Sequence, residues 1–230
     1  MIVFTHIPKT AGTSIRDSII KKKGEAAIFF DYSRPFSDSE IKRNIKCIAH
    51  SFTSRRNREQ KIIFGHFMTG KYCNFTTAGF VRRPGYSYVT FLRDPLQRAV
   101  SHFHYWKRIV GTDNRVWVKF TNENWDLERF LTSNYFANFQ SKFLYGCNLD
   151  TFDFVGVTEQ YDRSLELLGS YVPGFEGLNL VNANVNPLRK SESAYDVPGD
   201  MRRAFARLNG RDYELYEACL KRLDEAGRIR

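Results

Sequence analysis

One repeated order constrains the fold of this chain most strongly: a short apolar run, then polar residues, then a stretch of helical periodicity. Such runs are typical of buried strands, and strands that alternate with helices pair in parallel through right-handed crossovers. We therefore expect an α/β fold with a central, mostly parallel sheet flanked by helices. The expected strands are 2–7, 61–67, 86–95 and 152–157, and the expected helices are 13–24, 96–108, 159–169 and 200–230, with a junction near Gly210.

The length and composition fit one globular domain. A chain of 230 residues is within the size range of a single α/β domain. Hydrophobic residues make up 42% and charged residues 26%, which excludes a disordered or collagen-like class. No repeat, low-complexity tract or long linker divides the chain. We therefore expect one domain over residues 1–230.

The charge balance favours an anionic partner. Lysine and arginine number 35 against 25 aspartate and glutamate, which gives a formal net charge of +10. This excess attracts anions over long range but does not choose among nucleic acid, anionic glycan and nucleotide. Short basic runs are usually solvated surface. On charge alone, four arginines are therefore only weak candidates for contacts with the acceptor: Arg55, Arg56, Arg82 and Arg83.

The cysteines and the N-terminus carry no further signal. Cys47, Cys73, Cys147 and Cys219 lie far apart without metal-ligand spacing, so we interpret them as reduced, packed thiols and expect no metal. No apolar run approaches the ~20 residues of a membrane span. The sequence as given therefore predicts a soluble, cytoplasmic protein.

The expected first strand leads into a loop with the features of an anion site, residues 9–14. A loop that opens a helix directs backbone N–H groups at its contents, and the helix dipole favours an anion there. Gly12 permits close approach, and Thr13 and Ser14 add hydroxyl donors. The alternative is a bare helix cap in which one of these hydroxyls caps the helix and nothing is bound. Because Lys9 precedes Gly12, the loop is not the fingerprint of ATPases and GTPases, although it is P-loop-like in its strand-loop-helix order.

Four chemically capable residues fall at the ends of three different expected strands: Lys9, His66, Arg93 and Asp94. In parallel sheets, ligands bind beyond the carboxyl ends of the strands. We therefore expect these side chains to meet at one edge of the sheet. An ion pair of Arg93 with Asp94 or another carboxylate is the structural alternative for that arginine.

Two segments resemble one enzyme family. "HIPKTAGTS" (6–14) resembles the 5′-phosphosulfate loop of carbohydrate sulfotransferases that use 3′-phosphoadenosine 5′-phosphosulfate, a group that includes heparan sulfate 2-O-sulfotransferase. "FLRDPLQRAVSHF" (91–103) resembles the 3′-phosphate motif of the same enzymes. Three later segments are also similar to the family, so the resemblance runs from residue 2 to about 220. These segments are "FVGVTEQYDRSLELL", "NVNPLRKSE" and "LNGRDYELYEAC".

The resemblance implies a donor-binding set. It implies that Arg93 and Ser101 hold the 3′-phosphate, as a planar guanidinium suits paired bonds to phosphate oxygens. The other residues implied to bind the donor are those of the phosphosulfate loop and of a late loop: Lys9, Thr10, Ala11, Gly12, Thr13, Ser14, Arg189, Lys190 and Ser191.

Sulfuryl transfer requires a base for the acceptor hydroxyl, a cation near the oxygen that bridges sulfur and phosphorus, and in-line placement. Lys9 is our candidate for the cation, because its compact charge can follow the charge that develops there. The resemblance implies that His66 is the base, and an imidazole titrates in the useful range. A lone histidine is more often structural, and four others compete for the role: His6, His50, His102 and His104.

The sequence thus predicts a sulfotransferase that acts on a hydroxyl of a carbohydrate. The basic balance together with Trp117 and Trp125, taken as exposed, fits an anionic glycan, and no nucleic acid is expected. A nucleotide-dependent kinase and a non-catalytic binder of anionic polymers are the alternatives. Animal members of the resembled family are Golgi membrane proteins, so an anchor outside this sequence would place the chain in the Golgi lumen instead. The oligomeric state is not predicted.

Overall fold

A computed structural model describes residues 1–33, 35–53, 61–112, 114–178 and 194–228. Arg189, Lys190 and Ser191, implied as donor contacts, lie outside these ranges, as do Arg55 and Arg56. In the described part, a parallel sheet has the order β2-β3-β1-β6-β7, and β4 and β5 form a separate antiparallel pair. The strands are β1 (Ile2–Thr5), β2 (Ile28–Asp31), β3 (Ile62–Gly65), β4 (Asn74–Thr76), β5 (Gly79–Val81), β6 (Ser87–Leu92) and β7 (Phe154–Val157).

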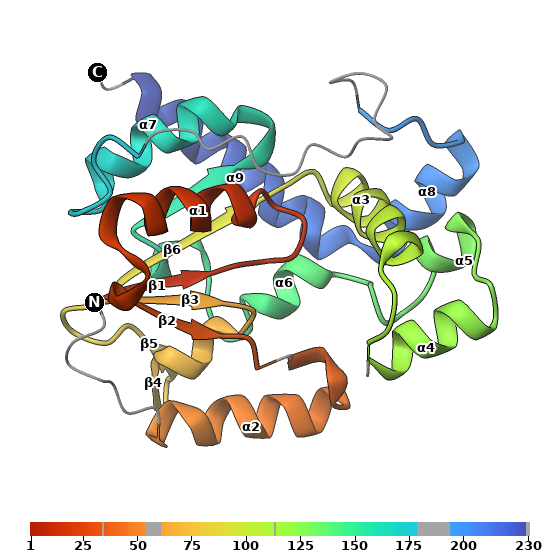
Figure 1. Cartoon of the computed structure of the whole chain (residues 1–230), viewed down its shortest axis with the longest axis horizontal. Coiled ribbons are helices and arrows are strands. Elements are labelled where there is room, and N and C mark those ends of the chain that lie inside the picture. The colour runs from red at the N-terminus through yellow and green to blue at the C-terminus, as the bar shows by residue number, and fades with distance from the viewer. Residues whose placement is uncertain (34, 54–60, 113, 179–193, 229–230) are drawn as a thin grey trace.

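Helices cover both faces of the sheet and its carboxyl end, and α1 and α2 lie on opposite faces (Figure 1). The α-helices are α1 (Gly12–Lys23), α2 (Glu40–Thr53), α3 (Pro95–Arg108), α4 (Arg115–Asn122), α5 (Leu127–Leu131), α6 (Phe139–Phe143), α7 (Tyr161–Tyr171), α8 (Gly199–Leu208) and α9 (Gly210–Arg228). Short 3-10 turns include η3 (Thr69–Tyr72) and η5 (Thr158–Gln160). The predicted α/β class and parallel sheet are confirmed. None of the described helices is both long and apolar enough to cross a membrane.

The strand order creates a switch point between β1 and β6. From β1 the chain continues to β2 and β3 on one side of the sheet, whereas from β6 it continues to β7 on the other. The loops that follow β1 and β6 therefore diverge and leave an opening between adjacent strand ends, which is where open α/β sheets bind ligands. Thr5 is level with Gly65 of β3 and with Thr90 of β6, so three loops leave the sheet at similar heights.

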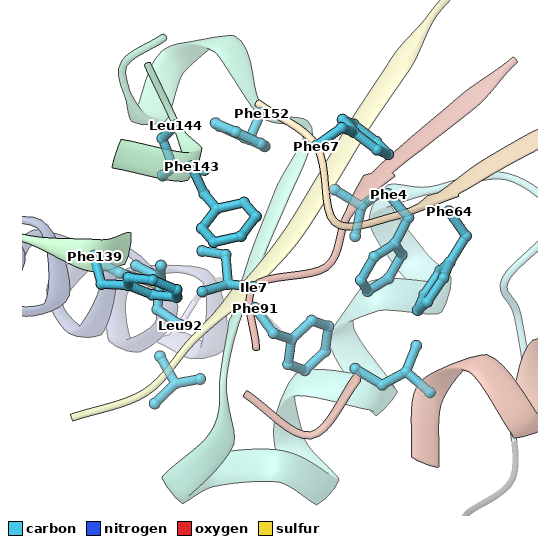
Figure 2. Packing of buried hydrophobic residues seen from close by; sticks show 14 of the residues in the cluster. Phe4, Ile7, Phe64, Phe67, Phe91, Leu92, Phe139, Phe143, Leu144 and Phe152 are labelled. Atoms are coloured by element: carbon cyan, nitrogen blue, oxygen red, sulfur yellow. The ribbon is translucent and has the colours of Figure 1, made fainter. Parts of the chain in front are cut away.

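The central strands are buried on both faces, as parallel sheets require. Phe4 of β1 packs against Phe64 of β3 and Phe91 of β6, with ring centroids 4.9 and 6.0 Å apart (Figure 2). Burial of one such side chain contributes about 1.5–3 kcal/mol. Phe139 and Phe143 of α6 extend the same core toward the carboxyl ends of the strands. The edge that bears the polar loops is thus supported by a rigid aromatic layer.

The segment between α3 and α5 was interpreted from the sequence in two ways, and one of its tryptophans was expected to be exposed but is not. The sequence left open an acceptor-facing loop or a partly buried connector, and the structure shows the connector, because α4 lies against the helices that follow β6. Trp125 is only 6% exposed, and the Trp117 Nε1 donates to the Trp106 carbonyl at 3.1 Å. Trp106 and Phe120 bury this segment in an aromatic cluster. The interpretation of Trp125 as an exposed glycan-facing aromatic is therefore wrong.

Candidate functional site

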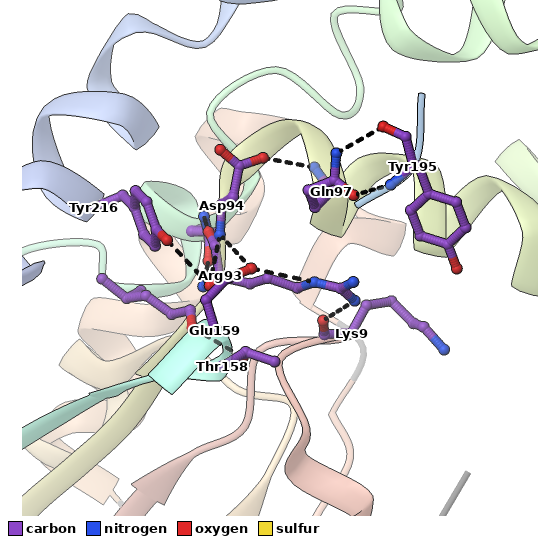
Figure 3. A network of polar contacts seen from close by, with 10 residues as sticks. Lys9, Arg93, Asp94, Gln97, Thr158, Glu159, Tyr195 and Tyr216 are labelled. Atoms are coloured by element: carbon purple, nitrogen blue, oxygen red, sulfur yellow. Dashed lines mark hydrogen bonds and ion pairs between the residues drawn. The ribbon is translucent and has the colours of Figure 1, made fainter. Parts of the chain in front are cut away.

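Lys9, His66 and Arg93 lie at the carboxyl edge of the sheet, after β1, β3 and β6. The Arg93 Nη1 donates to the Lys9 carbonyl at 3.3 Å across the switch point (Figure 3). The His66 Nδ1 is 2.7 Å from the carbonyl of His6, just before the Lys9 loop. The three residues thus belong to one hydrogen-bonded set of strand ends.

The loop between β1 and α1 has a strained backbone. Lys9 and Ala11 adopt left-handed conformations with φ of 73° and 63°, which cost on the order of 1–3 kcal/mol each in non-glycine residues. The buried Thr10 hydroxyl secures the loop by donating to the Ile7 carbonyl at 2.8 Å. Ala11 occupies the N-cap position of α1 and offers no side-chain cap, while Thr13 lies inside the first turn. The expected alternative, a helix capped by its own hydroxyl, is therefore wrong.

Gly12 is required by a close contact with His6. A Cβ at position 12 would lie 1.9 Å from the His6 Cδ2 and Nε2 atoms, so a larger residue would displace either the ring or the loop. The His6 ring is also 4.4 Å from the His66 ring, centroid to centroid. His6 therefore packs between the loop and His66 and fixes their separation. Burial keeps the pKa of His6 well below 6.5, so the ring is neutral at pH 7.

Lys9 lies in a region of excess positive charge. Its Nζ is 4.8 Å from the Tyr105 ring centroid, which favours a cation. Burial, which is the largest cause, acts together with Arg93 and Arg108 to lower the pKa of the Lys9 ammonium to about 8. The lowered pKa therefore shows first that the ammonium is poorly solvated, and the two arginines add positive charge nearby. A bound anion would stabilise the charged form of this lysine.

The alternative interpretation of Arg93 was an ion pair with Asp94 or another carboxylate. Arg93 does have a carboxylate partner, and that partner is Glu159, not Asp94. The Arg93 Nε is 3.6 Å from the Glu159 Oε1. The Asp94 Oδ1 instead accepts from the Gln97 N–H at 2.8 Å and caps α3. Arg93 thus combines a phosphate-compatible guanidinium with one partly exposed counter-ion.

Glu159 is held by two further donors (Figure 3). Its carboxylate accepts from the Asp94 N–H at 3.2 and 3.3 Å and from the Tyr216 hydroxyl at 3.1 Å. The side chain is 36% exposed, yet surrounding protein desolvates it and raises its pKa, against the opposing effect of Arg93. Glu159 therefore ties β7, α3 and α9 together beside the arginine.

The main chain of Arg93 is clamped by a buried amide. The Gln140 Oε1 accepts from the Arg93 N–H at 3.0 Å, and its Nε2 donates to the Arg93 carbonyl at 2.8 Å. Gln140 is in turn fixed because Asp212 of α9 accepts from the backbone N–H groups of Gln140 and Ser141 at 3.0 and 2.8 Å. Both Gln140 and Asp212 are almost fully buried. A path of hydrogen bonds therefore runs from α9 through α6 to Arg93.

The tautomer of His66 follows from its hydrogen bond. A carbonyl can only accept, so the His66 Nδ1 carries the proton that it donates to His6, and Nε2 carries the lone pair. Burial lowers the pKa of His66 below 6.5, so the ring is neutral at pH 7. The half-exposed ring of Tyr32 meets His66 edge-on at 5.0 Å. Chemically, the imidazole is ready to accept a proton at Nε2.

The other histidines occupy different environments. His102 of α3 is buried in an aromatic cluster near Arg98, and its pKa is far below 6.5 because of burial. His104 packs against Tyr195 at 5.4 Å, and Gln97 holds that tyrosine's backbone with bonds of 3.0 and 2.6 Å. His50 lies on α2. His6 and His66 are the histidines at the strand ends of the described chain.

The remaining candidates have mixed outcomes. Ser101 lies on α3 and is 9% exposed, and its role at a phosphate stays a prediction. Arg82 donates to Asp153 at 2.6 and 2.7 Å, and Arg83 donates to the carbonyls of Cys73 and Ser51. Both arginines thus have partners within the chain, and their role as acceptor contacts stays a prediction. Among the described residues, no group of three His, Cys, Asp or Glu side chains is placed to hold a metal ion.

Comparison with known proteins gives a match to a family profile. Residues 1–217 match the profile described as the Sulfotransferase family. Among solved structures, the chain is similar to mouse sulfotransferase SULT7A1 complexed with PAP, at 16% identity and a TM-score of 0.39, over 90% of this chain and 62% of that one. This chain thus spans less than two thirds of that structure, and the likeness is too low to carry an argument. No match was found among curated protein sequences.

Proposed function

The chain belongs to the sulfotransferase family, and from this premise we propose that it transfers a sulfuryl group from 3′-phosphoadenosine 5′-phosphosulfate to a hydroxyl of a carbohydrate. The observation that carries the proposal is the convergence at one sheet edge of two cations, Lys9 and Arg93, with a neutral histidine whose Nε2 bears a lone pair. A cationic pair suits the donor's phosphates, and the histidine suits the acceptor's proton.

The donor would span the switch point. The loop 9–14 would receive the 5′-phosphosulfate on the N–H groups at the start of α1, where the N-cap residue Ala11 provides no side-chain cap. An anion there would also stabilise the Lys9 ammonium, whose pKa is lowered to about 8. Arg93 and Ser101 would hold the 3′-phosphate. The proposal also includes three donor contacts from later in the sequence, namely Arg189, Lys190 and Ser191.

His66 takes up the proton that the acceptor hydroxyl loses. As the acceptor oxygen bonds to sulfur, its proton passes to the His66 Nε2, and the bond between sulfur and the bridging oxygen breaks with its electrons on the leaving phosphate. The Nδ1 hydrogen bond to the His6 carbonyl stabilises the imidazolium that forms. The Lys9 ammonium would offset the charge that develops on the bridging oxygen. Positioning and charge stabilisation thus account for the reaction without further chemical groups.

An anionic sugar fits the surroundings of the base. Tyr32 offers a half-exposed ring beside His66, and the partly exposed guanidinium of Arg16, which pairs with Asp17 at 2.9 Å, lies near Tyr32. An aromatic ring with an adjacent cation can pack against a sugar and pair with its acidic group. The net charge of +10 acts in the same direction. These features support an anionic over a neutral carbohydrate.

The proposal is tested by transfer to defined acceptors. The purified chain is incubated with 3′-phosphoadenosine 5′-phosphosulfate and matched panels of uronate-containing, sulfated and neutral oligosaccharides, and both nucleotide release and the gain of one SO₃ on the sugar are measured by mass spectrometry. We expect transfer to the anionic panels. Phosphorylation of a sugar with ATP would favour the kinase alternative, and salt-sensitive glycan binding without any transfer would favour the non-catalytic binder.

Donor affinity is expected to depend on pH through Lys9. The ammonium has a pKa of about 8 in the free protein, and a bound anion raises this value, so binding takes up a proton above pH 8. Affinity for 3′-phosphoadenosine 5′-phosphate should therefore be highest below pH 8 and fall as pH rises, by up to about tenfold per pH unit. Titration calorimetry at pH 7, 8 and 9 in buffers of different ionisation enthalpy measures both effects.

Lys9→Met is the matched control for this titration, because methionine keeps the length of the side chain without its charge. It should bind more weakly at pH 7 and lose the pH dependence, since the nucleotide's phosphates are already ionised above pH 7. A slope that is the same in the variant and the unmodified protein would remove Lys9 from the donor site.

A further inference from the structure

Two thiols that are distant in the sequence lie in contact where the end of η3 meets the segment after α6. The Cys73 Sγ is 3.7 Å from the Cys147 Sγ, although 74 residues separate them. Cys73 follows η3, the turn that succeeds His66, and Cys147 follows α6, the helix that clamps Arg93. Both are free thiols in this structure. The pair therefore lies between the segment that follows His66 and the segment that follows α6.

We propose that Cys73 and Cys147 form a site of reversible disulfide formation, and that small-molecule disulfides of the glutathione type oxidise it. Sulfur atoms in a disulfide are about 2.05 Å apart and their side chains adopt a defined torsion. At 3.7 Å the two sulfurs are at van der Waals contact, so closure requires small side-chain rotations and no movement of an intervening group. This inference is independent of the sulfotransferase proposal.

The order of steps follows from exposure. Cys73 is fully buried and Cys147 is partly exposed, so the external disulfide meets Cys147 first. The Cys147 thiolate attacks one sulfur, forms a mixed disulfide and releases the first small thiol. The Cys73 thiolate then attacks the Cys147 sulfur and releases the second. Two protein thiols are oxidised, one small disulfide is reduced, and the two protons leave on the two small thiols.

The surroundings favour Cys73 as the resolving thiolate. Its pKa lies below the usual thiol range, above all because of its hydrogen bond with Cys147 and against the opposing effect of burial, with the Tyr88 hydroxyl and Arg83 also lowering it. The same hydrogen bond, and burial, raise the pKa of Cys147, so loss of the Cys147 proton limits the first step. The segments are already in register, since the Thr69 hydroxyl donates to the Phe143 carbonyl at 3.3 Å. A disulfide would join segments that pack together, so we expect stabilisation and little distortion.

The test uses the full chain and glutathione buffers. After incubation in oxidised glutathione, denaturation and alkylation, non-reducing peptide mapping should show a 73–147 crosslink, with two alkylated cysteines remaining. The melting temperature should rise by roughly 5–10 °C and return to its starting value with dithiothreitol. Cys147→Ser should lose both the crosslink and the reversible shift, whereas Cys219→Ser, a buried thiol on α9, should keep both.

Mapping of the unmodified chain keeps the test decisive even if a cysteine variant folds poorly. Four alkylated cysteines after incubation in oxidised glutathione would overturn the proposal. So would a crosslink that involves Cys47 in place of Cys147, or a glutathione adduct on Cys147 that Cys73 never resolves.

Discussion

His66→Ala is expected to lower the turnover number of sulfuryl transfer by about 10²–10⁴-fold, the usual contribution of a positioned general base. The affinity for 3′-phosphoadenosine 5′-phosphate should change little, because His66 follows β3 and the proposed phosphate ligands follow β1 and β6. Steady-state kinetics on the acceptor found by screening, with calorimetry for the nucleotide, separates the two effects. In the unmodified protein, the rate should fall at acidic pH as His66, whose pKa lies below 6.5, becomes protonated. The variant should not show this fall.

His50→Ala is the matched control for this variant, since His50 is an exposed residue of α2 that the proposed mechanism does not use. It should turn over at the rate of the unmodified protein. If the His66 variant retained full turnover, His66 would not be the base, and His6 would become the next residue to test because its ring packs against both His66 and Gly12.

Arg93→Ala is expected to weaken nucleotide binding by about 10- to 100-fold, the loss that corresponds to charge-assisted hydrogen bonds worth ~1.5–3 kcal/mol. It should lower transfer as well, because Arg93 also donates to the Lys9 carbonyl and so helps to shape the loop. The loss should be largest for nucleotides with a 3′-phosphate and small for ADP, which lacks that group. Calorimetric titration with both nucleotides measures this selectivity.

Two controls separate charge from geometry. Arg82→Ala removes the same charge from an arginine that pairs with Asp153 elsewhere, and it should leave nucleotide binding unchanged. Arg93→Lys keeps the charge but loses the planar fork, so we expect intermediate affinity. Equal losses for 3′-phosphorylated and unphosphorylated nucleotides in Arg93→Ala would show that Arg93 does not hold the 3′-phosphate.

Much of the architecture was predictable from local patterns. The strands expected at 2–7, 61–67, 86–95 and 152–157 correspond to β1, β3, β6 and β7, although each is shorter than predicted. The helices fared equally well, since α1 starts at Gly12 and α3 at Pro95, within one residue of expectation. Long apolar runs and helix signals such as Gly24, which ends α1, make these elements readable. Parallel pairing then followed from their alternation.

Other features depended on tertiary contacts and left little local signal. The sequence interpretation did not identify β2, a four-residue strand, or the amphipathic helix α2. Gln140, Glu159 and Asp212 went unrecognised as supports of Arg93, because they lie 47, 66 and 119 positions away in the sequence. Gln140 and Glu159 contact Arg93 only in the fold, and Asp212 acts on it through Gln140. Trp125 was expected to be exposed because its neighbours in the sequence are polar, but its ring is buried.

The central claim is that this fold binds a 3′-phosphorylated donor nucleotide, and a thermal unfolding series tests it most directly. The chain is melted with 3′-phosphoadenosine 5′-phosphate, ADP and ATP at equal concentrations. A ligand at about one hundred times its dissociation constant adds roughly 2.7 kcal/mol of stability, which a melting curve resolves readily. We predict strong stabilisation by 3′-phosphoadenosine 5′-phosphate and little by the other two. Equal or greater stabilisation by ATP, or no response to any of the three, would contradict the account.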